Sequence, residues 1–540
     1  MPIKTENLVS KGYFPEELVP AFTTEDLAKI TSIVITNLNT FDPLGRKKTS
    51  IPLLFSIPKV KGYRRNLTIP NPLHYFRLCD TIVSNWPAIL AHTQLSNISM
   101  TKLDLGGNRS ILKLNFDEFI SQRILRSAGY RYLLKIDISR FYNSIYTHSI
   151  PWALHTKAVS KVNRRRASHF GNALDEDSRK IQDGQTIGIP IGPDTSRIIS
   201  EIILASIDKE LSNHLPNFKG VRIIDDYYLY FKNIAHIEIA RSVVHKALKD
   251  YELELNQGKE TIAELPEIIE SPWYTALKNV RFTNDVRTQK KELIEFFDKA
   301  FRFAKEHEEE AVMSYAIAKI RPTIFKVENL PMLQALLLNS LVLEPKTISL
   351  LSEILIGYSA SKRRLNLELL RTALNEFVIF HSELNNEYEI SWALWTLKAL
   401  KIKVSAPAAK LLSKSNNSLI MLMVLDLKRS KLIPKGLNIS HWRIYLKGDS
   451  LFNEHWLFAY EVKVRGWMRT TDNYIDTEPF FNLLKAKKVR FYKGDKKLDV
   501  SKVRVTISAG STTSFESVIA FENLFDGLDS ATKVTSDVPF

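Results

Sequence analysis

The segment "RIIDDYYLYF" (residues 222–231) places two adjacent carboxylates, Asp225 and Asp226, between two runs of apolar and aromatic residues. Runs rich in Ile, Phe and Tyr are typical of β-strands, and a short polar break between two such runs predicts a hairpin. We therefore expect two antiparallel strands with both acids at the turn. Asp is also frequent in turns because its side chain bonds to nearby backbone, so the motif alone is compatible with an acidic surface turn.

A third carboxylate, Asp137, follows another apolar run in "YLLKIDISRFYNSIY" (residues 132–146). The run predicts a strand that ends at Asp137 and leads into a helical segment, where Asp could also serve as the helix N-cap. Acids on two strands could instead converge on hard cations, because Mg²⁺ prefers a few carboxylates, waters and substrate phosphates. Two ions about 3.5–4 Å apart stabilise the attacking and leaving oxygens of phosphoryl transfer. His148 and His155 could act as a general acid or a metal ligand, and are interpreted instead as hydrogen-bonded packing residues near the palm.

The charge of the chain fits an anionic substrate. Among 540 residues, 75 are Lys or Arg and 59 are Asp or Glu, and the net charge of +16 favours nucleic acid, nucleotides or anionic lipid as partners. The single cysteine, Cys79, excludes a disulfide within the chain. The longest apolar runs, such as residues 332–343, are too short to span a bilayer, and the N-terminus lacks the apolar core of a signal peptide. We expect a cytoplasmic protein without a membrane partner.

A chain of this length requires more than one hydrophobic core, and its patterning changes near residue 290. Residues 51–80 have the composition of short strands and turns, and residues 131–290 alternate strand-like with helical segments, which predicts an α+β fold. Beyond that point apolar residues recur at helical spacing, which predicts a stacked helical array. The predicted domains are residues 1–290, of α+β type, and residues 291–540, of α-helical type.

Five segments resemble, in the same order, the fingers and palm motifs of reverse transcriptases. These segments are "IPKVKGYRRNLTIP" (57–70), "KIDISRFYNSIY" (135–146), "GQTIGIPIGPDTSR" (184–197), "IIDD" (223–226) and "LNQGKETI" (255–262). The resemblance implies a reverse-transcriptase-like palm and fingers. It implies that Asp137, Asp225 and Asp226 are the catalytic carboxylates and hold two Mg²⁺ ions, with Mn²⁺ as the alternative metal.

The same resemblance implies a set of residues that bind the nucleotide. Lys59 and Arg65 match the basic positions of the fingers segment that grips the incoming triphosphate. Tyr142 matches the aromatic position that presses on the sugar and excludes a 2′-hydroxyl. Arg197 follows the Gly-Pro motif, where its charge suits a phosphate or nucleotide contact, and Lys259 matches the lysine of the last motif.

Three stretches are more specifically similar to the abortive-infection (Abi) reverse transcriptases of bacteria, AbiK-like polymerases that defend against phage. These stretches are "GYFPEEL" (12–18), "FYNSIYTHSIPWALHTKAVSK" (141–161) and "GIPIGPDTSRIISEIIL" (188–204). The similarity implies a HEAT-like helical repeat domain behind the palm, dNTPs as substrates and a homo-oligomer. It further implies template-independent synthesis that starts from a tyrosine hydroxyl of the protein and leaves single-stranded DNA covalently attached.

Two positions depart from the reverse-transcriptase pattern. Ile223 stands where an aromatic residue usually precedes the double Asp, and Ile191 stands where a glutamine usually follows the Gly-x-Pro. Template-copying enzymes use these positions to handle the template and the primer end, so the departures favour an untemplated reaction. The alternatives are a conventional RNA-templated, primer-dependent reverse transcriptase and, from another class, a nucleic-acid-binding or assembly protein with an inactive palm.

Overall fold

The computed structural model describes residues 3–42, 49–107, 109–113, 115–166, 168–215, 218–470 and 472–503. The elements up to residue 130 are α1 (Thr5–Lys11), α2 (Glu25–Ala28), α3 (Thr31–Thr36), α4 (Leu38–Phe41), β1 (Leu53–Pro58), η2 (Val60–Gly62), β2 (Arg64–Ile69), α5 (Pro72–Ser84), α6 (Trp86–Thr93) and α7 (Phe116–Ser127). The elements up to residue 280 are β3 (Tyr132–Asp137), α8 (Phe141–Ser144), α9 (Ser149–His155), α10 (Lys157–Val162), α11 (Phe170–Lys180), α12 (Asp194–His214), β4 (Lys219–Ile223), β5 (Asp226–Phe231), α13 (Ala235–Asp250), β6 (Thr261–Glu264) and α14 (Pro272–Lys278). The remaining elements are α15 (Val286–Glu306), α16 (Val312–Ile320), η3 (Val327–Asn329), α17 (Leu330–Leu343), η4 (Pro345–Thr347), α18 (Ile348–Ala360), α19 (Leu367–Glu383), α20 (Glu387–Ala399), α21 (Ala406–Leu412), α22 (Ser418–Arg429), η5 (Ser440–Tyr445), η6 (Gly448–Phe452), α23 (Trp456–Arg465) and α24 (Pro479–Ala486).

A four-stranded antiparallel sheet of order β4-β5-β3-β6 forms the centre of the N-terminal half. Side chains alternate along β5: Tyr227 and Leu229 pack in the main core with side chains of α12 and α13. Tyr228 and Tyr230 pack in a smaller core on the opposite face, together with Phe119 of α7. The residues of β4 and β5 are thus largely buried on both faces, whereas Ile262 of the edge strand β6 is exposed.

The strands β1 and β2 form a separate two-stranded antiparallel sheet. The prediction of strands and turns for residues 51–80 is confirmed as far as Ile69 and is wrong beyond it, because α5 begins at Pro72. The same Pro-rich segment that suggested a turn starts this helix: Asn71 caps it by accepting a hydrogen bond from the Leu73 amide, and Pro72 occupies a first-turn position that needs no amide donor.

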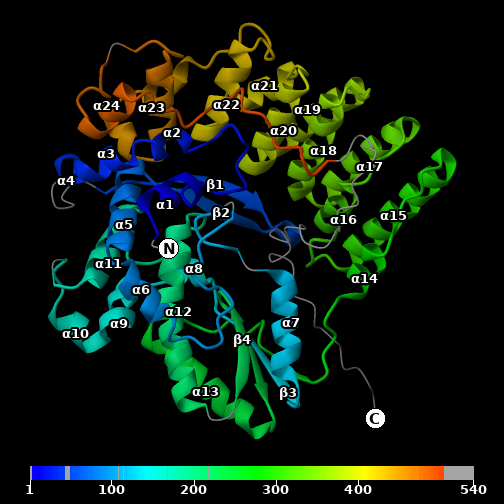
Figure 1. Cartoon of the computed structure of the whole chain (residues 1–540). Helices are drawn as coiled ribbons and strands as arrows, with labels where there is room; N and C mark the ends of the chain where they lie inside the picture. Colours follow the sequence, from blue (N-terminus) through cyan, green and yellow to red (C-terminus); the bar gives the residue numbers. More distant parts are fainter. Residues whose placement is uncertain are drawn as a thin grey trace.

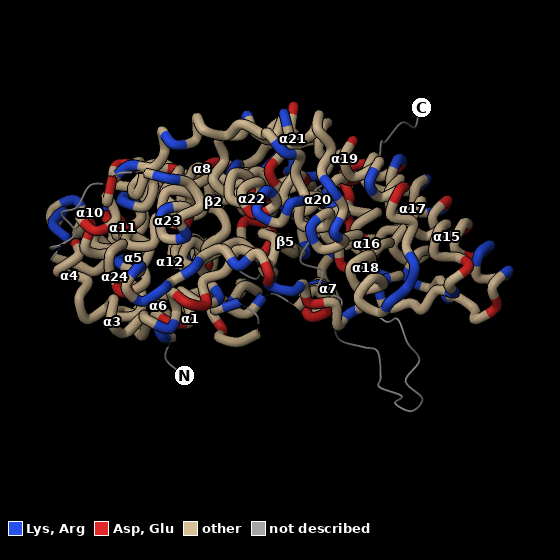
Figure 2. The backbone as a smooth tube through the Cα atoms, turned by 90° about the horizontal axis from the view of Figure 1, so that it is seen from above, with Lys and Arg blue, Asp and Glu red and all other residues tan. Residues whose placement is uncertain are grey.

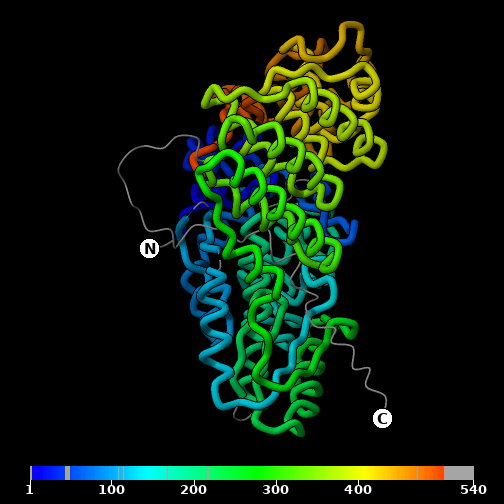
Figure 3. Tube along the Cα trace, turned by 90° about the vertical axis from the view of Figure 1, so that its right-hand side faces the viewer, coloured from blue at the N-terminus to red at the C-terminus, as the bar shows by residue number. Residues whose placement is uncertain are grey.

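The C-terminal half is a curved row of helices from α15 to α22 (Figure 1). Alternate helices of the row pack on each other. On one side α16 packs on α18, α18 on α20 and α20 on α22; on the other α15 packs on α17, and α19 on α21. This two-layer stacking is typical of helical repeat proteins. Seen from the side, the row rises from the part of the chain that carries the four-stranded sheet to the opposite end of the molecule (Figure 3). The predicted α+β fold with a helical C-terminal region is confirmed.

The end of the described chain returns to its beginning. The Thr23 amide donates a hydrogen bond to the Phe491 carbonyl (2.8 Å), and Phe22 and Tyr492 form an isolated β-bridge. Residues of both halves therefore share one continuous buried cluster that runs from Ile3 to Val503. The division of the chain at residue 290 stays a proposal, because α15 spans that residue and the two halves are packed together.

The positive charge of the chain is not gathered in one place. Figure 2 shows basic and acidic residues interspersed along both halves of the molecule as seen from above. Within the described ranges, no helix is long and apolar enough to cross a bilayer. In the view of Figure 2 the described residues form no single basic face.

Candidate active site

The hairpin predicted from "RIIDDYYLYF" is present, with its turn one residue earlier than expected. The turn residues are Ile224 and Asp225, whereas Asp226 is the first residue of β5 and pairs with Ile223 of β4. Ile224 has a positive φ of 48°, a conformation that is unfavourable for a β-branched residue. The shift leaves Asp225 in the turn and places Asp226 in the sheet.

Asp137 and Asp226 lie directly opposite each other at the ends of β3 and β5. Directly opposed residues on antiparallel strands have their Cβ atoms roughly 4.5–5.5 Å apart, so the two carboxylates share one end of the sheet with Asp225 next to them. The alternative role of Asp137 as a helix N-cap is excluded, because α8 begins at Phe141 and its N-cap position is Arg140.

The carboxylate of Asp137 is buried, with 6% of the residue exposed, and has two polar neighbours from the segment before β6. Asn256 Nδ2 donates a hydrogen bond to Asp137 Oδ2 (2.9 Å), and Lys259 Nζ lies 3.4 Å from the same oxygen. The backbone amide of Asn256 also donates a hydrogen bond to the backbone carbonyl of Asp137 (2.9 Å). Lys259 thus lies beside Asp137, and its role in nucleotide binding stays a prediction. Asn256 is a neighbour that the sequence interpretation missed.

A buried ion cluster underlies the turn. Arg222 is fully buried, and its guanidinium donates to both oxygens of Glu201 (3.0 Å each) and to Asp208 Oδ2 (2.8 Å). Burial lowers the pKa of Arg222, but the two carboxylates more than compensate and raise it well above its ordinary value. Arg222 Nη1 also donates to the Ile224 carbonyl (2.9 Å). Through this bond the cluster stabilises the left-handed conformation of Ile224, the residue next to Asp225 in the turn.

Tyr142 lies on α8 beside the turn. It lines a small cavity of about 10 Å³ with Arg197, Ser200, Glu201, Ile224, Thr101 and Leu103. Burial raises the pKa of Tyr142 to about 12, although a hydrogen bond with Ser200 acts in the opposite direction. The structure thus brings Tyr142 and Arg197 together next to the double-Asp turn.

The guanidinium of Arg197 has protein partners. It donates to the carbonyls of Ile111 (3.3 Å) and Leu112 (3.1 Å), and Nη1 lies 3.7 Å from Asp194 Oδ1. These bonds fix the residues that precede α7 against α12. In this structure the Arg197 side chain binds these backbone carbonyls. Its contact with a nucleotide stays a prediction.

Lys59 and Arg65 lie on the other sheet, at the β1–β2 hairpin. Lys59 follows the last residue of β1, and Arg65 is the second residue of β2, opposite Ile57. The Gly-Pro segment links this hairpin to α8, the helix that follows Asp137, because the Ile189 amide donates to the Tyr142 carbonyl (2.8 Å) and the Thr68 amide donates to the Ile191 carbonyl (2.8 Å). The two predicted parts of the site are therefore joined by one backbone segment.

The packing interpretation of the two histidines is confirmed. His148 Nδ1 bonds to Asp175 Oδ2 (2.6 Å), and His155 Nε2 accepts a hydrogen bond from the Gly171 amide (3.2 Å). In the part of the chain that the structure describes, no three His, Cys, Asp or Glu side chains are arranged to hold one metal ion. The donor set at the strand ends consists of hard carboxylate oxygens, which are the protein ligands that Mg²⁺ prefers.

Residues 57–296 match the family model described as reverse transcriptase (RNA-dependent DNA polymerase). A reverse transcriptase domain of the polymerase type is therefore present in this chain, and the matched residues include all three carboxylates, the last two residues of β1 and all of β2. The match covers less than half of the chain and does not reach α16 or the helices after it.

No curated protein matches the chain. Among solved structures, the chain is similar to telomerase from Candida albicans in complex with a fragment of telomeric RNA, at 13% identity and a TM-score of 0.29, over 74% of this chain and 66% of that one. It is also similar to apo telomerase from Candida tropicalis, at 12% identity and a TM-score of 0.31, over 76% of this chain and 72% of that one. The chain thus spans just under two thirds of the Candida albicans protein, and TM-scores this low bear on neither fold nor function.

Proposed function

We propose that this chain is a DNA polymerase of reverse-transcriptase type that transfers nucleotides from dNTPs and acts in bacterial defence against phage. The observation that carries nucleotidyl transfer is the opposition of Asp137 and Asp226, with Asp225 beside them in the turn. Like charges directly opposite on a sheet are destabilising, and cations bound between the two carboxylates would offset that repulsion. Lys259 supplies one positive charge, 3.4 Å from Asp137.

The hard carboxylate oxygens favour Mg²⁺, with Mn²⁺ as the alternative. We propose Asp137, Asp225 and Asp226 as its ligands on the chemistry of the donors, although no three such side chains of the described residues are arranged around one ion position. Two bound ions would supply Lewis-acid stabilisation of the attacking and leaving oxygens. Asn256 orients the carboxylate of Asp137 through its hydrogen bond. The assigned nucleotide-binding residues are Lys59 and Arg65 for the triphosphate, Tyr142 for the sugar, and Arg197 and Lys259 for further phosphate contacts.

We further propose that synthesis starts on a tyrosine hydroxyl of the protein and needs no template. In the first step a bond forms between the tyrosine oxygen and the α-phosphorus of a dNTP, the α–β phosphoanhydride bond breaks, pyrophosphate leaves and the phenolic proton passes to solvent. Two residues support an untemplated reaction. Ile223 is 5% exposed and packs in the small core rather than presenting an aromatic ring, and Ile191 carries an apolar side chain where reverse transcriptases usually have a glutamine.

The resemblance to Abi polymerases supports the remaining parts of the proposal. They are a role in abortive infection, single-stranded DNA left covalently attached to the protein, a homo-oligomeric state and a cytoplasmic location. The helical row behind the reverse transcriptase domain agrees with the helical repeat region of those enzymes.

The test is incubation of nuclease-treated, full-length protein with Mg²⁺ and labelled dNTPs, without added nucleic acid. Products are separated on denaturing gels with and without protease. Label that migrates with the protein, and that protease releases as DNA, is the expected result. The variant carrying Asp225→Asn and Asp226→Asn should lose incorporation, whereas Asp298→Asn, an exposed acid of α15, is the matched control and should retain it.

Two other results would replace the proposal. Label that appears only when RNA and a primer are supplied would identify a conventional reverse transcriptase, which the description of the matching family as an RNA-dependent DNA polymerase favours. Full incorporation by the double-Asp variant would show that the assigned carboxylates are wrong. Absence of incorporation under both conditions, with phage defence retained by that variant, would identify a binding or assembly protein.

A further inference from the structure

The hairpin that carries Lys59 and Arg65 is anchored on the helical half of the chain. Arg64, the first residue of β2, binds Glu389 of α20 with two parallel hydrogen bonds, from Nη1 to Oε1 (2.7 Å) and from Nη2 to Oε2 (2.9 Å). The Glu389 side chain is 1% exposed and that of Arg64 is 27% exposed. A bidentate pair of this kind fixes the orientation of both side chains as well as their separation.

The same guanidinium also holds the other strand of the hairpin. Arg64 Nε donates to Ser56 Oγ (2.6 Å), and Nη2 donates to the Ser56 carbonyl (3.1 Å). One side chain therefore links β1, β2 and α20. Rotation of the hairpin relative to α20 would break bonds on both sides of Arg64.

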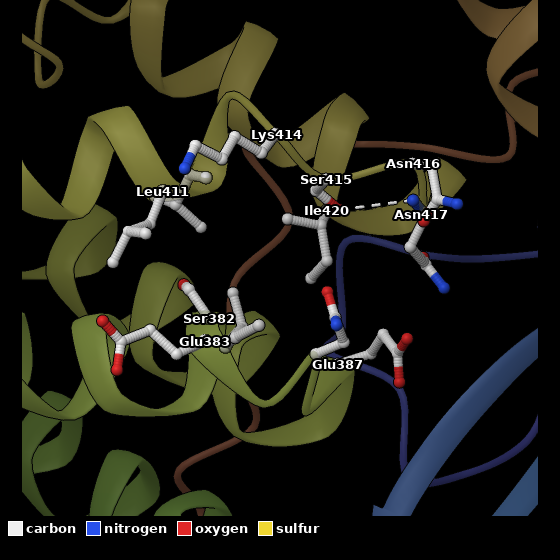
Figure 4. Close-up of a pocket in the computed structure, with 12 residues that line it drawn as sticks. Ser382, Glu383, Glu387, Leu411, Lys414, Ser415, Asn416, Asn417 and Ile420 are labelled. Atoms are coloured by element: carbon white, nitrogen blue, oxygen red, sulfur yellow. Dashed lines mark hydrogen bonds between the residues drawn. The ribbon is translucent and has the colours of Figure 1, made fainter.

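Two further residues of the helical half bind the backbone of β1. Glu387 Oε2 accepts a hydrogen bond from the Ser56 amide (3.1 Å), and Asn417 Nδ2 donates to the Leu54 carbonyl (3.0 Å). Both side chains also line a cavity of about 400 Å³ between α19–α20 and α21–α22 (Figure 4). Edge-strand amides and carbonyls need partners, and here helical side chains supply them.

The geometry of β2 connects this anchor to nucleotide binding. Successive side chains of a strand point to opposite faces, so the direction in which Arg64 is held also sets the direction of Arg65. Lys59 follows Pro58, which lies opposite Arg64 in the register. The position of both predicted triphosphate ligands therefore depends on the bond between Arg64 and α20.

We propose that the helical half of the chain positions the nucleotide-binding hairpin, with Arg64 and Glu389 as positioning residues. Glu387 and Asn417 support them through the β1 backbone. This inference rests on the proposed function in one respect, the assignment of Lys59 and Arg65 to the triphosphate. It gives the helical half a role in binding the incoming nucleotide.

The test uses the full-length protein and the variants Arg64→Gln, Glu389→Gln and the charge exchange Arg64→Glu with Glu389→Arg. Hydrogen exchange of residues 53–69 reports on the hairpin, and the Kd of a dNTP in the presence of Mg²⁺ reports on the ligand site. Each single variant should raise exchange in the hairpin but not in β3–β5, and should raise the Kd by about tenfold, the loss expected for one charged contact. The charge exchange should restore part of both losses.

Arg302→Gln is the matched control, because Arg302 forms an exposed ion pair with Asp298 on α15 and should change neither measurement. Where incorporation is measured, KM should rise while kcat changes by less than about threefold, as expected for a loss of ground-state binding. Wild-type exchange in the hairpin of Glu389→Gln, or a wild-type Kd despite faster exchange, would overturn the inference. Absence of dNTP binding by the wild-type protein would instead refute the proposed function, and the exchange data would still decide whether α20 holds the hairpin.

Discussion

Replacement of Arg222 by Met should destabilise the double-Asp hairpin more than replacement of any solvent-exposed residue does. The side chain is fully buried, and its removal would leave Glu201 and Asp208 as carboxylates without their guanidinium partner. Breaking a buried ion pair by removing one partner costs about 3–5 kcal/mol. The Ile224 carbonyl would also lose the donor that holds its left-handed backbone.

The assay is hydrogen exchange of the β4–β5 amides. One factor of ten in an equilibrium corresponds to about 1.4 kcal/mol, so protection should fall by about 10²- to 10⁴-fold. Arg302→Met removes an exposed guanidinium from α15 and should change protection by less than about threefold, because exposed pairs contribute about 0–1 kcal/mol.

The loss should depend on pH with a defined sign. Burial raises the pKa of the Asp208 carboxyl in the folded protein, while Arg222 acts to lower it. Without Arg222 the folded-state pKa of Asp208 should rise further, so the native state binds a proton that the unfolded state releases at a lower pH. The deficit of Arg222→Met should therefore be small below the unfolded pKa of Asp and grow as the pH rises through the folded pKa.

Adding Glu201→Gln and Asp208→Asn to Arg222→Met should recover part of the protection, because the uncompensated charges are removed. Protection of Arg222→Met within threefold of wild type would refute the reasoning. So would a loss of equal size at low and high pH, since it would show that the two carboxylates are not responsible.

Two further predictions concern the sugar and the Gly-Pro segment. Tyr142→Ala should lower the preference for dNTPs over rNTPs by about tenfold or more in kcat/KM, because the ring beside the turn would no longer exclude a 2′-hydroxyl; an unchanged ratio would remove Tyr142 from the sugar site. Gly192→Ala should lower the free energy of unfolding by about 1–3 kcal/mol, because Gly192 has a φ of 122° and a Cβ there would lie 2.9 Å from Pro15 Cγ. Gly436→Ala is the control in thermal unfolding, since Gly436 has a positive φ but nothing lies within 4 Å of an added Cβ. It should lower the free energy of unfolding by less than Gly192→Ala does.

The sequence was sufficient to predict the strands that carry the acids, because local patterning determines them. β3 ends at Asp137 and the double-Asp hairpin follows, as the apolar runs indicated. The exact turn was not predictable, since Ile224 adopts a left-handed conformation that its residue type disfavours and that Arg222 stabilises from within the core. A tertiary contact here overrides the local preference.

The partners of Arg222 carried a weak signal that the sequence interpretation missed. Glu201 and Asp208 are seven residues apart, so they share one face of α12, and both are buried in that helix. Two acids on a buried helix face indicate a buried cation. The bond between Arg64 and Glu389 had no such signal, because it joins residues 325 positions apart and only the three-dimensional fold brings them together.

The hydrogen bond between Thr23 and Phe491, with the adjacent Phe22–Tyr492 bridge, has a consequence for synthesis on the ribosome. Translation at about 5–20 residues per second needs roughly half a minute to a minute and a half to reach the partner of Thr23. During that interval Phe14, Phe22 and Phe41 lack the rings that contact them in the folded chain, which belong to Phe491, Tyr492 and Phe480. The N-terminal segment therefore completes its packing only after residues 480–492 have been synthesised, and until then its aromatic side chains are exposed to other chains.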